Sequence, residues 1–368
     1  MIPVAEPCIS EHDIALVNEA LKSGWISSSG KFLDLFEKQW AAFCDMPYGI
    51  AVSNGSVALD VAVDLLDLKP GDEVILPTFT IISPAQSVVR AGGVPVLVDS
   101  DPRTWQMDAG QIESRITSRT RAILVVHIYG HPADMDPILD IARRHKLTVI
   151  EDAAEVHGAE YKGRRCGGLG DISTFSFYAN KLVTTGEGGM VLVRRPELAE
   201  RAQGLRNLCF QKKQRFLHDE LGYNFRLTNL QAALAIGQIE RMEQIVARKR
   251  AIAAIYTELL GDIPGLQLPV EEPWAKNVYW VYGVVLGEEL GLDAVQLAGR
   301  LRDSGIETRP FFLGMHQQPV FQKMGLFRGE RFVVAERLAQ RGLYLPSGLT
   351  IDDAEIAKAA DCLRRALN

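Results

Sequence analysis

The stretch Ser173–Gly189 reads STFSFYANKLVTTGEGG, and it joins a strand-like run to a lysine in a glycine-containing loop. Lys181 follows just past the end of the run 173–177. The turn 184–189 then leads into a second apolar run, Met190–Val193. A lysine at such a strand end is partly removed from water, which lowers its pKa and favours the neutral, nucleophilic amine. Taken alone, a lysine in a loop is more often a solvated surface residue, so its surroundings must decide.

Short apolar runs alternate with helical patterns from residue 50 to residue 195. Most runs are rich in Val and Ile and lack strict alternation, as expected of strands that are buried on both faces. Helix signals lie between them, at 56–68 and from Asp136–Pro137 onward. This alternation predicts an α/β fold with a mostly parallel sheet. The runs are Glu73–Leu76, Pro95–Asp99, Ala122–Ile128, Thr148–Asp152, Ser173–Phe177 and Met190–Val193.

The C-terminal part of the chain has a different pattern. A helical pattern over 228–260 is followed by breaks that contain proline and glycine, and then by mixed strands and helices. We therefore predict a large domain over residues 1–245 and a smaller α+β domain over residues 246–368. The length of 368 residues agrees with two domains, at a prior of about 150 residues for each.

Composition and charge exclude several classes of protein. The net charge of −6 argues against general nucleic-acid binding, which needs a basic surface. No apolar run approaches the roughly 20 residues that span a bilayer, and the N-terminus lacks a signal-peptide pattern. The five cysteines form no CxxC pair, so we expect neither disulfides nor a metal site, and a cytoplasmic location without membrane contact. A nicotinamide dehydrogenase is excluded because no GxGxxG follows an early strand.

Two further segments lie at predicted strand ends, where ligands bind in open α/β sheets. Residues 53–56, SNGS, form a small turn before a helix, and such a turn offers free N–H groups to a phosphate. Residues 149–155, VIEDAAE, place two adjacent carboxylates at a strand end, with side chains on opposite faces. Asp152 is the candidate that enters the site. Each signal is weak alone, because capped helix starts and terminal aspartates are common.

Read together, the motifs of this chain resemble those of the DegT/DnrJ/EryC1/StrS family of sugar aminotransferases. The resemblance runs from residue 25 to residue 316. It implies the fold type I architecture of pyridoxal-phosphate (PLP) dependent transferases, with a large domain around a mostly parallel sheet and a smaller α+β domain. The motifs that carry it are SNGS (53–56), PTFT (77–80), HIYGHPADMDPI (127–138), EDAAE (151–155), GDISTFSFYANK (170–181), TTGEGG (184–189) and GYNFRLTNLQAA (222–233).

The resemblance implies roles for individual residues. Lys181 matches the catalytic lysine that bonds to the PLP aldehyde, and Asp152 matches the partner of the ring nitrogen. Asn224 matches the asparagine that reaches the cofactor phosphate of the neighbouring subunit, which implies a homodimer with shared active sites. Relatives often carry an aromatic residue where this chain has Ile81, so the residue that stacks on the ring is left open between Ile81, Phe79 and another side chain. The positions that match the phosphate-binding residues are Gly55, Ser56 and Ser176.

The resemblance also implies the reaction. A related branch of the family has histidine in place of the lysine and dehydrates its sugar, so the lysine favours amino transfer. L-Glutamate is the expected donor, and pyridoxamine phosphate is the alternate cofactor form. The expected acceptor is GDP-4-keto-6-deoxy-D-mannose, which becomes GDP-perosamine for O-antigen synthesis. Because segment 208–216 departs from that pattern, dTDP- or UDP-linked keto-sugars remain alternatives, and a PLP-binding regulatory protein without turnover is an alternative of another class.

Six residues are candidates for contact with the sugar nucleotide. Two of them, Trp25 and Ser27, lie in the N-terminal segment 1–30, which is expected to contribute to the substrate site. Three cationic candidates suit a diphosphate, although a short charge run is more often a solvated loop. The histidine matches a loop that approaches the sugar pocket in relatives, although a lone histidine is usually structural. The six are Trp25, Ser27, Lys212, Arg215, Arg309 and His316.

Overall fold

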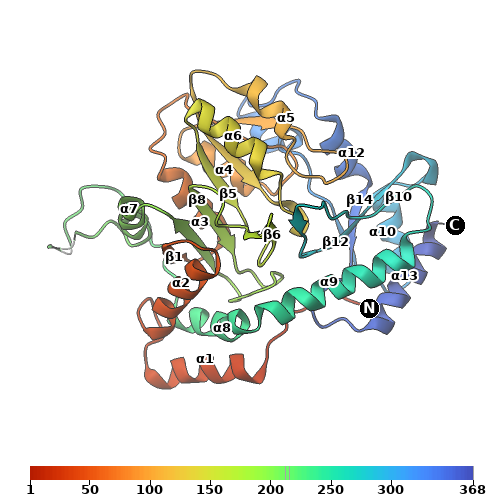
Figure 1. Cartoon of the computed structure of the whole chain (residues 1–368), viewed down its shortest axis with the longest axis horizontal. Helices are drawn as coiled ribbons and strands as arrows, with labels where there is room; N and C mark the ends of the chain where they lie inside the picture. Colours follow the sequence, from red (N-terminus) through yellow and green to blue (C-terminus); the bar gives the residue numbers. More distant parts are fainter. Residues whose placement is uncertain (212, 215, 368) are drawn as a thin grey trace.

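A seven-stranded sheet is the centre of the computed structural model, which describes residues 1–211, 213–214 and 216–367 (Figure 1). The strand order is β1-β9-β8-β5-β4-β2-β3. Strands from β8 to β3 pair in parallel, whereas β9 runs antiparallel to both β8 and β1. The strands are β1 (Tyr48–Val52), β2 (Glu73–Pro77), β3 (Val94–Val98), β4 (Thr120–Val126), β5 (Thr148–Asp152), β8 (Ile172–Ser176) and β9 (Gly189–Val193).

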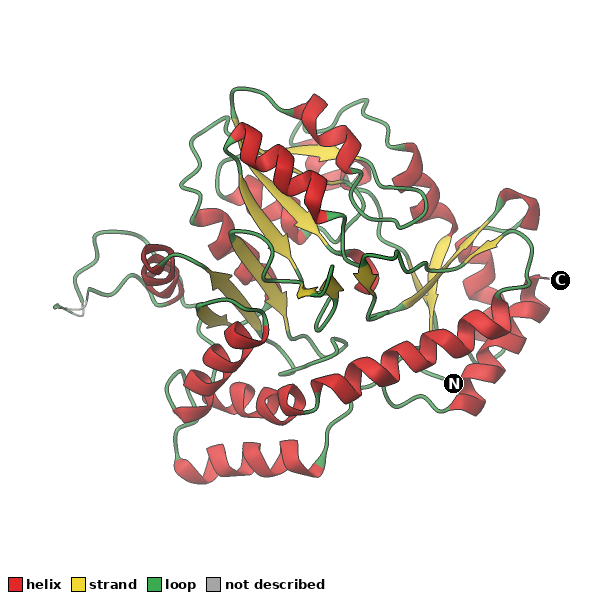
Figure 2. Cartoon of the chain, in the orientation of Figure 1, coloured by secondary structure: helices red, strands yellow, loops and turns green. Residues whose placement is uncertain are grey.

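Helices cover this sheet, and the central strands are buried as a result (Figure 2). Every residue of β2 and of β9 is buried, which explains why these strands lack polar alternation in the sequence. The predicted mostly parallel α/β fold is confirmed. The helices of this part are α1 (Glu11–Ser23), α2 (Lys31–Phe43), α3 (Gly55–Asp64), α4 (Ser83–Arg90), α5 (Ala109–Ile112), α6 (Met135–His145), α7 (Pro196–Arg206) and α8 (Asn229–Glu240), with the 3-10 turns η1 (Glu113–Arg115) and η2 (Ile128–Gly130).

The helical pattern over 228–260 forms two helices rather than one. Helix α8 begins at a capping box, in which the Thr228 and Gln231 side chains satisfy each other's backbone N–H groups. It ends at Glu240, and Arg241 separates it from α9 (Met242–Leu260). The long α9 runs from beside the large sheet to the C-terminal part of the chain (Figure 1).

The C-terminal part is built on an antiparallel sheet with the strand order β10-β12-β14-β13. Its own buried cluster joins Tyr256 of α9 to Tyr282 of β12, and Ile2 from the N-terminus packs into it. The predicted boundary at residue 245 stays a prediction, because α9 contributes to both buried clusters. The elements are β10 (Leu266–Gln267), β12 (Tyr282–Leu286), β13 (Arg309–Pro310), β14 (Gly342–Leu345), η3 (Glu288–Leu290), α10 (Ala294–Asp303), η4 (Met315–Gln317), α11 (Pro319–Lys323), α12 (Val333–Arg341) and α13 (Asp353–Leu367).

A third, small sheet connects the two parts. Strand β11 (Ala275–Lys276) pairs with β6 (Glu160–Tyr161), which pairs with β7 (Arg164–Arg165). These two-residue strands leave no periodic signal in the sequence and were not predicted. No helix among the described residues is both long and apolar enough to cross a membrane.

The parallel strands bring several loops to one edge of the large sheet. The carboxyl ends of β2, β5 and β8 are Pro77, Asp152 and Ser176, and α3 begins at Gly55 beside β8. Since ligands of open α/β folds bind at the carboxyl edge, this edge is where the candidate site is expected.

Candidate active site

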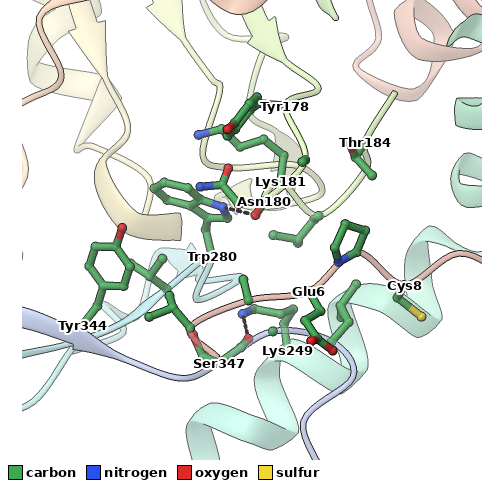
Figure 3. Close-up of a pocket in the computed structure, with 18 of the residues that line it drawn as sticks. Glu6, Cys8, Tyr178, Asn180, Lys181, Thr184, Lys249, Trp280, Tyr344 and Ser347 are labelled. Atoms are coloured by element: carbon green, nitrogen blue, oxygen red, sulfur yellow. Dashed lines mark hydrogen bonds between the residues drawn. The ribbon is translucent and has the colours of Figure 1, made fainter. Parts of the chain in front are cut away.

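Lys181 lies in the loop that follows β8, and its side chain is only 10% exposed. The Nζ atom lies 3.6 Å from the centroid of the Trp280 ring and 3.9 Å from Glu155 Oε1. Trp280 also fixes the loop, because its Nε1–H donates to the carbonyl of Asn180 at 2.8 Å (Figure 3). Burial lowers the pKa of Lys181, while Glu155 and Asp152 oppose that shift. The loop therefore presents a buried amine rather than the solvated lysine of the alternative interpretation.

The two adjacent carboxylates of β5 point in opposite directions, as the strand pleat predicts. Glu151 is buried and accepts hydrogen bonds from the backbone N–H groups of residues 167, 169 and 170 and from His127 Nε2. Asp152 is also buried, but its described hydrogen bond is a single long one, from the Ala154 N–H at 3.2 Å. Burial raises the pKa of Asp152, and the Ala154 N–H and Lys181 act in the opposite direction. A buried carboxylate with so few donors is suited to pair with a cationic ring nitrogen.

Glu155 is a third acidic residue of the site, to which the sequence interpretation gave no role. Its Oε2 accepts the Tyr129 N–H at 2.7 Å, and this bond aims Oε1 at Lys181. Burial raises the pKa of Glu155 to about 7, with the Lys181 charge as the main opposing influence. The signal in the sequence was its position in EDAAE, three residues after Asp152.

The residues predicted to hold a phosphate come together at the start of α3. A Cβ atom added to Gly55 would lie 2.6 Å from the Ser176 Cβ, so the backbone of the helix start and the end of β8 are in direct contact. Asn54 caps the helix by accepting the Val57 N–H, and Ser56 Oγ lies 2.8 Å from Ser83 Oγ. The first N–H groups of a helix lack intrahelical partners and attract anions. This cradle, with a buried amine and a buried carboxylate at the same edge, fits PLP.

Of the two residues considered for ring stacking, the structure leaves Ile81 accessible. Its side chain is 47% exposed, whereas Phe79 is buried against Tyr129, Phe311 and Phe312. Phe79 is therefore a core residue of the sheet edge and not free to stack on a ligand.

His316 lies next to the same edge, but its ring is used inside the protein. The side chain is 4% exposed, Nδ1 lies 2.8 Å from Thr78 Oγ1, and Nε2 lies 3.2 Å from Glu336 Oε1. The ring thus holds the 315–317 turn on the loop after β2. The expected contact of His316 with the substrate stays a prediction.

Trp25, Ser27 and Asn224 lie on exposed segments. Trp25 is 61% exposed, and its loop is held by Asn229, whose side chain donates to the Trp25 carbonyl and whose N–H donates to the Ser27 carbonyl. Asn224 is exposed beside a short bridge to Asn207. Asn229 was missed as an organiser of this region, although it stands in the quoted motif GYNFRLTNLQAA. The two cationic candidates Lys212 and Arg215 lie outside the described residues.

A cavity of about 350 Å³ reaches Lys181 from the C-terminal part of the chain (Figure 3). Arg309 of β13 lines it and pairs with Glu307 at 2.6 Å. Of the residues predicted to bind PLP, this cavity contacts Lys181 but none of Gly55, Ser56, Asp152 and Ser176. It is therefore a neighbouring space that shares Lys181 with the cofactor cradle.

Comparison with known proteins places this geometry in a family. The model of the DegT/DnrJ/EryC1/StrS aminotransferase family matches residues 7–364. The chain belongs to this family. It is thus a PLP-dependent sugar aminotransferase, and the predicted cofactor is confirmed.

Similar proteins cover almost the full length of the chain. It is 40% identical to the GDP-perosamine synthase of Caulobacter vibrioides, across 100% of this chain and 98% of the relative. The GDP-perosamine synthase of Escherichia coli O157:H7 is 39% identical, with 96% and 95% covered. Among solved structures, S. venezuelae DesV is 35% identical with a TM-score of 0.90, covering 97% of this chain and 94% of DesV. The aminotransferase TlmJ of Streptoalloteichus hindustanus is 30% identical with a TM-score of 0.93, covering 100% and 99%.

Proposed function

We propose that the protein transfers an amino group from L-glutamate to GDP-4-keto-6-deoxy-D-mannose and so forms GDP-perosamine. The full-length identity to GDP-perosamine synthases supports this acceptor over dTDP- and UDP-linked sugars. We further propose that the reaction takes place in the cytoplasm and supplies an amino sugar for O-antigen synthesis. The alternative of a regulatory protein without turnover finds no support in these relatives, and the buried amine of Lys181 beside two buried carboxylates carries the assignment to catalysis.

Different residues at the sheet edge hold different parts of the cofactor. Gly55, Ser56 and Ser176 hold the phosphate, Asp152 pairs with the ring nitrogen, and Ile81 covers the ring. When bound, PLP supplies an aldehyde that takes up the amino group and a protonated ring that stabilises negative charge on the substrate carbon. The burial of Asp152 keeps water from competing with this pairing.

Lys181 and Glu155 form the proton-handling pair of the site. Lys181 would bond to the PLP aldehyde as a neutral amine and would carry a proton to and from the substrate carbon, so its proton must be available yet not held too tightly. Glu155, with a pKa of about 7 and its Oε1 3.9 Å from the amine, favours the protonated form of Lys181. Burial favours the neutral form. These two effects act in opposite directions on the pKa of Lys181.

We propose a homodimer in which Asn224 completes the site of the other subunit. The exposure of Asn224 in the single chain supports this, and so do large exposed apolar side chains nearby in sequence, Leu221 and Tyr223. Trp25 and Ser27 contact the sugar nucleotide from the N-terminal loop, and Arg309, Lys212 and Arg215 are the proposed cationic contacts of its diphosphate.

A substrate panel tests the proposal. The purified holoenzyme is incubated with glutamate and, separately, with GDP-, dTDP- and UDP-linked 4-keto-6-deoxy sugars, and amino-sugar products are measured by mass spectrometry. We expect the GDP-linked sugar to react fastest. A preference for a dTDP- or UDP-linked sugar overturns the acceptor but not the reaction class. No product from any sugar, with cofactor bound and unchanged by glutamate, supports the regulatory alternative.

A further inference from the structure

The cavity beside Lys181 lies where several chain segments meet, and it is built from both parts of the protein. The N-terminal residues 4–8 form one wall, and the loop 178–182 forms another. Residues 280–281 and the loop 347–349 close it from the C-terminal part, and α9 contributes Lys249 (Figure 3). Its volume of about 350 Å³ is within the roughly 300–1,000 Å³ of small-molecule sites.

Lys249 is a buried cation without an acidic partner. Its side chain is 3% exposed, and its one described hydrogen bond runs from Nζ to the Ser347 carbonyl, as Figure 3 shows. An ammonium group has three N–H donors, so two remain for a ligand. Among the described residues no carboxylate forms an ion pair with Lys249, and burial is the single cause that lowers its pKa to about 7. A charge buried in this way is costly unless a counter-ion accompanies it.

The other charged groups around the cavity are already matched. Arg309 pairs with Glu307, which also accepts the Val4 N–H at 3.0 Å. Lys181 faces Glu155 at 3.9 Å. Glu6 also lines the cavity and is exposed on its N-terminal wall. Of the described cationic groups that line the cavity, Lys249 is therefore the one without an acidic partner.

We propose that this cavity binds a small organic carboxylate, with Lys249 as its counter-ion. One unmatched charge suits a carboxylate better than a phosphate group, which carries about −1.5 to −2 at pH 7. The apolar side chains of Val4, Leu182 and Val281 line the same space and suit a short carbon chain. The site is separate from the PLP cradle.

The ligand would contact several segments of the chain at once. It contacts the loop that carries Lys181, the N-terminal wall and the loop 347–349 at once. Amino transfer, which is the family's reaction, consumes an amino acid and releases a 2-oxo acid, so carboxylates of this class are always present during turnover. The site thus offers the enzyme a means to sense its donor or its by-product, and this part rests on the proposed function.

Isothermal titration of the holoenzyme with glutarate tests the proposal, because glutarate has neither an amino nor a keto group that could react with the cofactor. We expect Lys249→Met to weaken binding by about tenfold or more, the range for loss of a charged hydrogen bond. Lys358→Met, the same change at an exposed lysine of α13, should bind like the parent. Ala5→Trp narrows the cavity from its exposed wall while leaving Lys249 in place, and it should also weaken binding.

Several outcomes of these measurements would overturn the proposed carboxylate site. Equal glutarate affinity in the parent and in Lys249→Met, or no binding by the parent, overturns the proposal. Undiminished binding by Ala5→Trp places the ligand elsewhere and also overturns it. Inorganic phosphate and acetate are then compared as competitors of glutarate. If phosphate displaces glutarate as well as acetate does, the preference for carboxylates is refuted. A protein that binds glutarate through Lys249 but forms no amino sugar contradicts the proposed function and leaves this site standing.

Discussion

Replacing Glu155 with glutamine tests how the site controls the proton of Lys181. The amide keeps an oxygen for the Tyr129 N–H but removes the charge whose Oε1 lies 3.9 Å from Lys181 Nζ. Two unit charges at that distance attract each other by ~4 kcal/mol at an effective dielectric constant of about 20, which sets an upper limit. Losing this attraction favours the neutral amine. Even a third of that energy, ~1.4 kcal/mol, raises the neutral fraction about tenfold.

The assay is the rate at which cofactor-free protein captures added PLP, followed by stopped-flow absorbance. At about pH 8, Glu155 is mostly ionised because its pKa is about 7, so in the parent its charge favours the protonated form of Lys181. We expect Glu155→Gln to capture PLP about tenfold faster at this pH. Glu187→Gln, an exposed acid in the next turn of the chain, is the matched control and should behave like the parent. Capture by Glu155→Gln that is unchanged or slower at pH 8 would refute the proton-handling role.

Three further results are expected. Gly55→Ala places a methyl group 2.6 Å from the Ser176 Cβ, so it should weaken PLP binding by ~1–3 kcal/mol with an unchanged circular dichroism spectrum, and unaltered affinity would remove Gly55 from the cradle. Lys249→Met should stabilise the protein by ~3 kcal/mol at pH 7 in carboxylate-free buffer, because the buried amine loses its proton near pH 7 while the unfolded chain keeps it to roughly pH 10.4. The parent therefore gains stability as pH rises through this window, so the difference in urea denaturation should vanish by about pH 10, and a constant difference would exclude this cause. Mixing inactive Lys181→Ala with Asn224→Ala should restore roughly half the native activity to each mixed dimer, since one site then has both residues, and no recovery would exclude shared sites.

The sequence predicted the parts of the fold that depend on local pattern. Buried parallel strands such as β5 have continuous apolar runs, and the helical pattern from residue 228 onward marks the start of α8, so both were visible. The break at Arg241 was not, because the residues on either side of it are ordinary helix formers. The two-residue strand β11 depends on a partner more than 100 residues away, and no local pattern encodes it.

The same distinction holds for the site. Lys181, Asp152 and the Gly55 turn stand at strand ends. Because strands and helices alternate along the chain, most strands are parallel, and their carboxyl ends meet at one edge of the sheet. His316 could not be assigned in this way, because its burial depends on Thr78 and Glu336, which come from distant segments. Trp280 and Lys249 acquire their roles through packing between the two parts of the chain, and a tryptophan just before a strand or a lysine in a helix carries no sequence signal of such a role.

The most direct test of the central claim is to find which lysine carries the cofactor. The holoenzyme is reduced with borohydride, digested, and examined by peptide mass spectrometry for a pyridoxyl group. We expect the label on Lys181, and no label in Lys181→Ala. A label on the other buried amine, Lys249, or a bound cofactor attached to no lysine, would contradict the account.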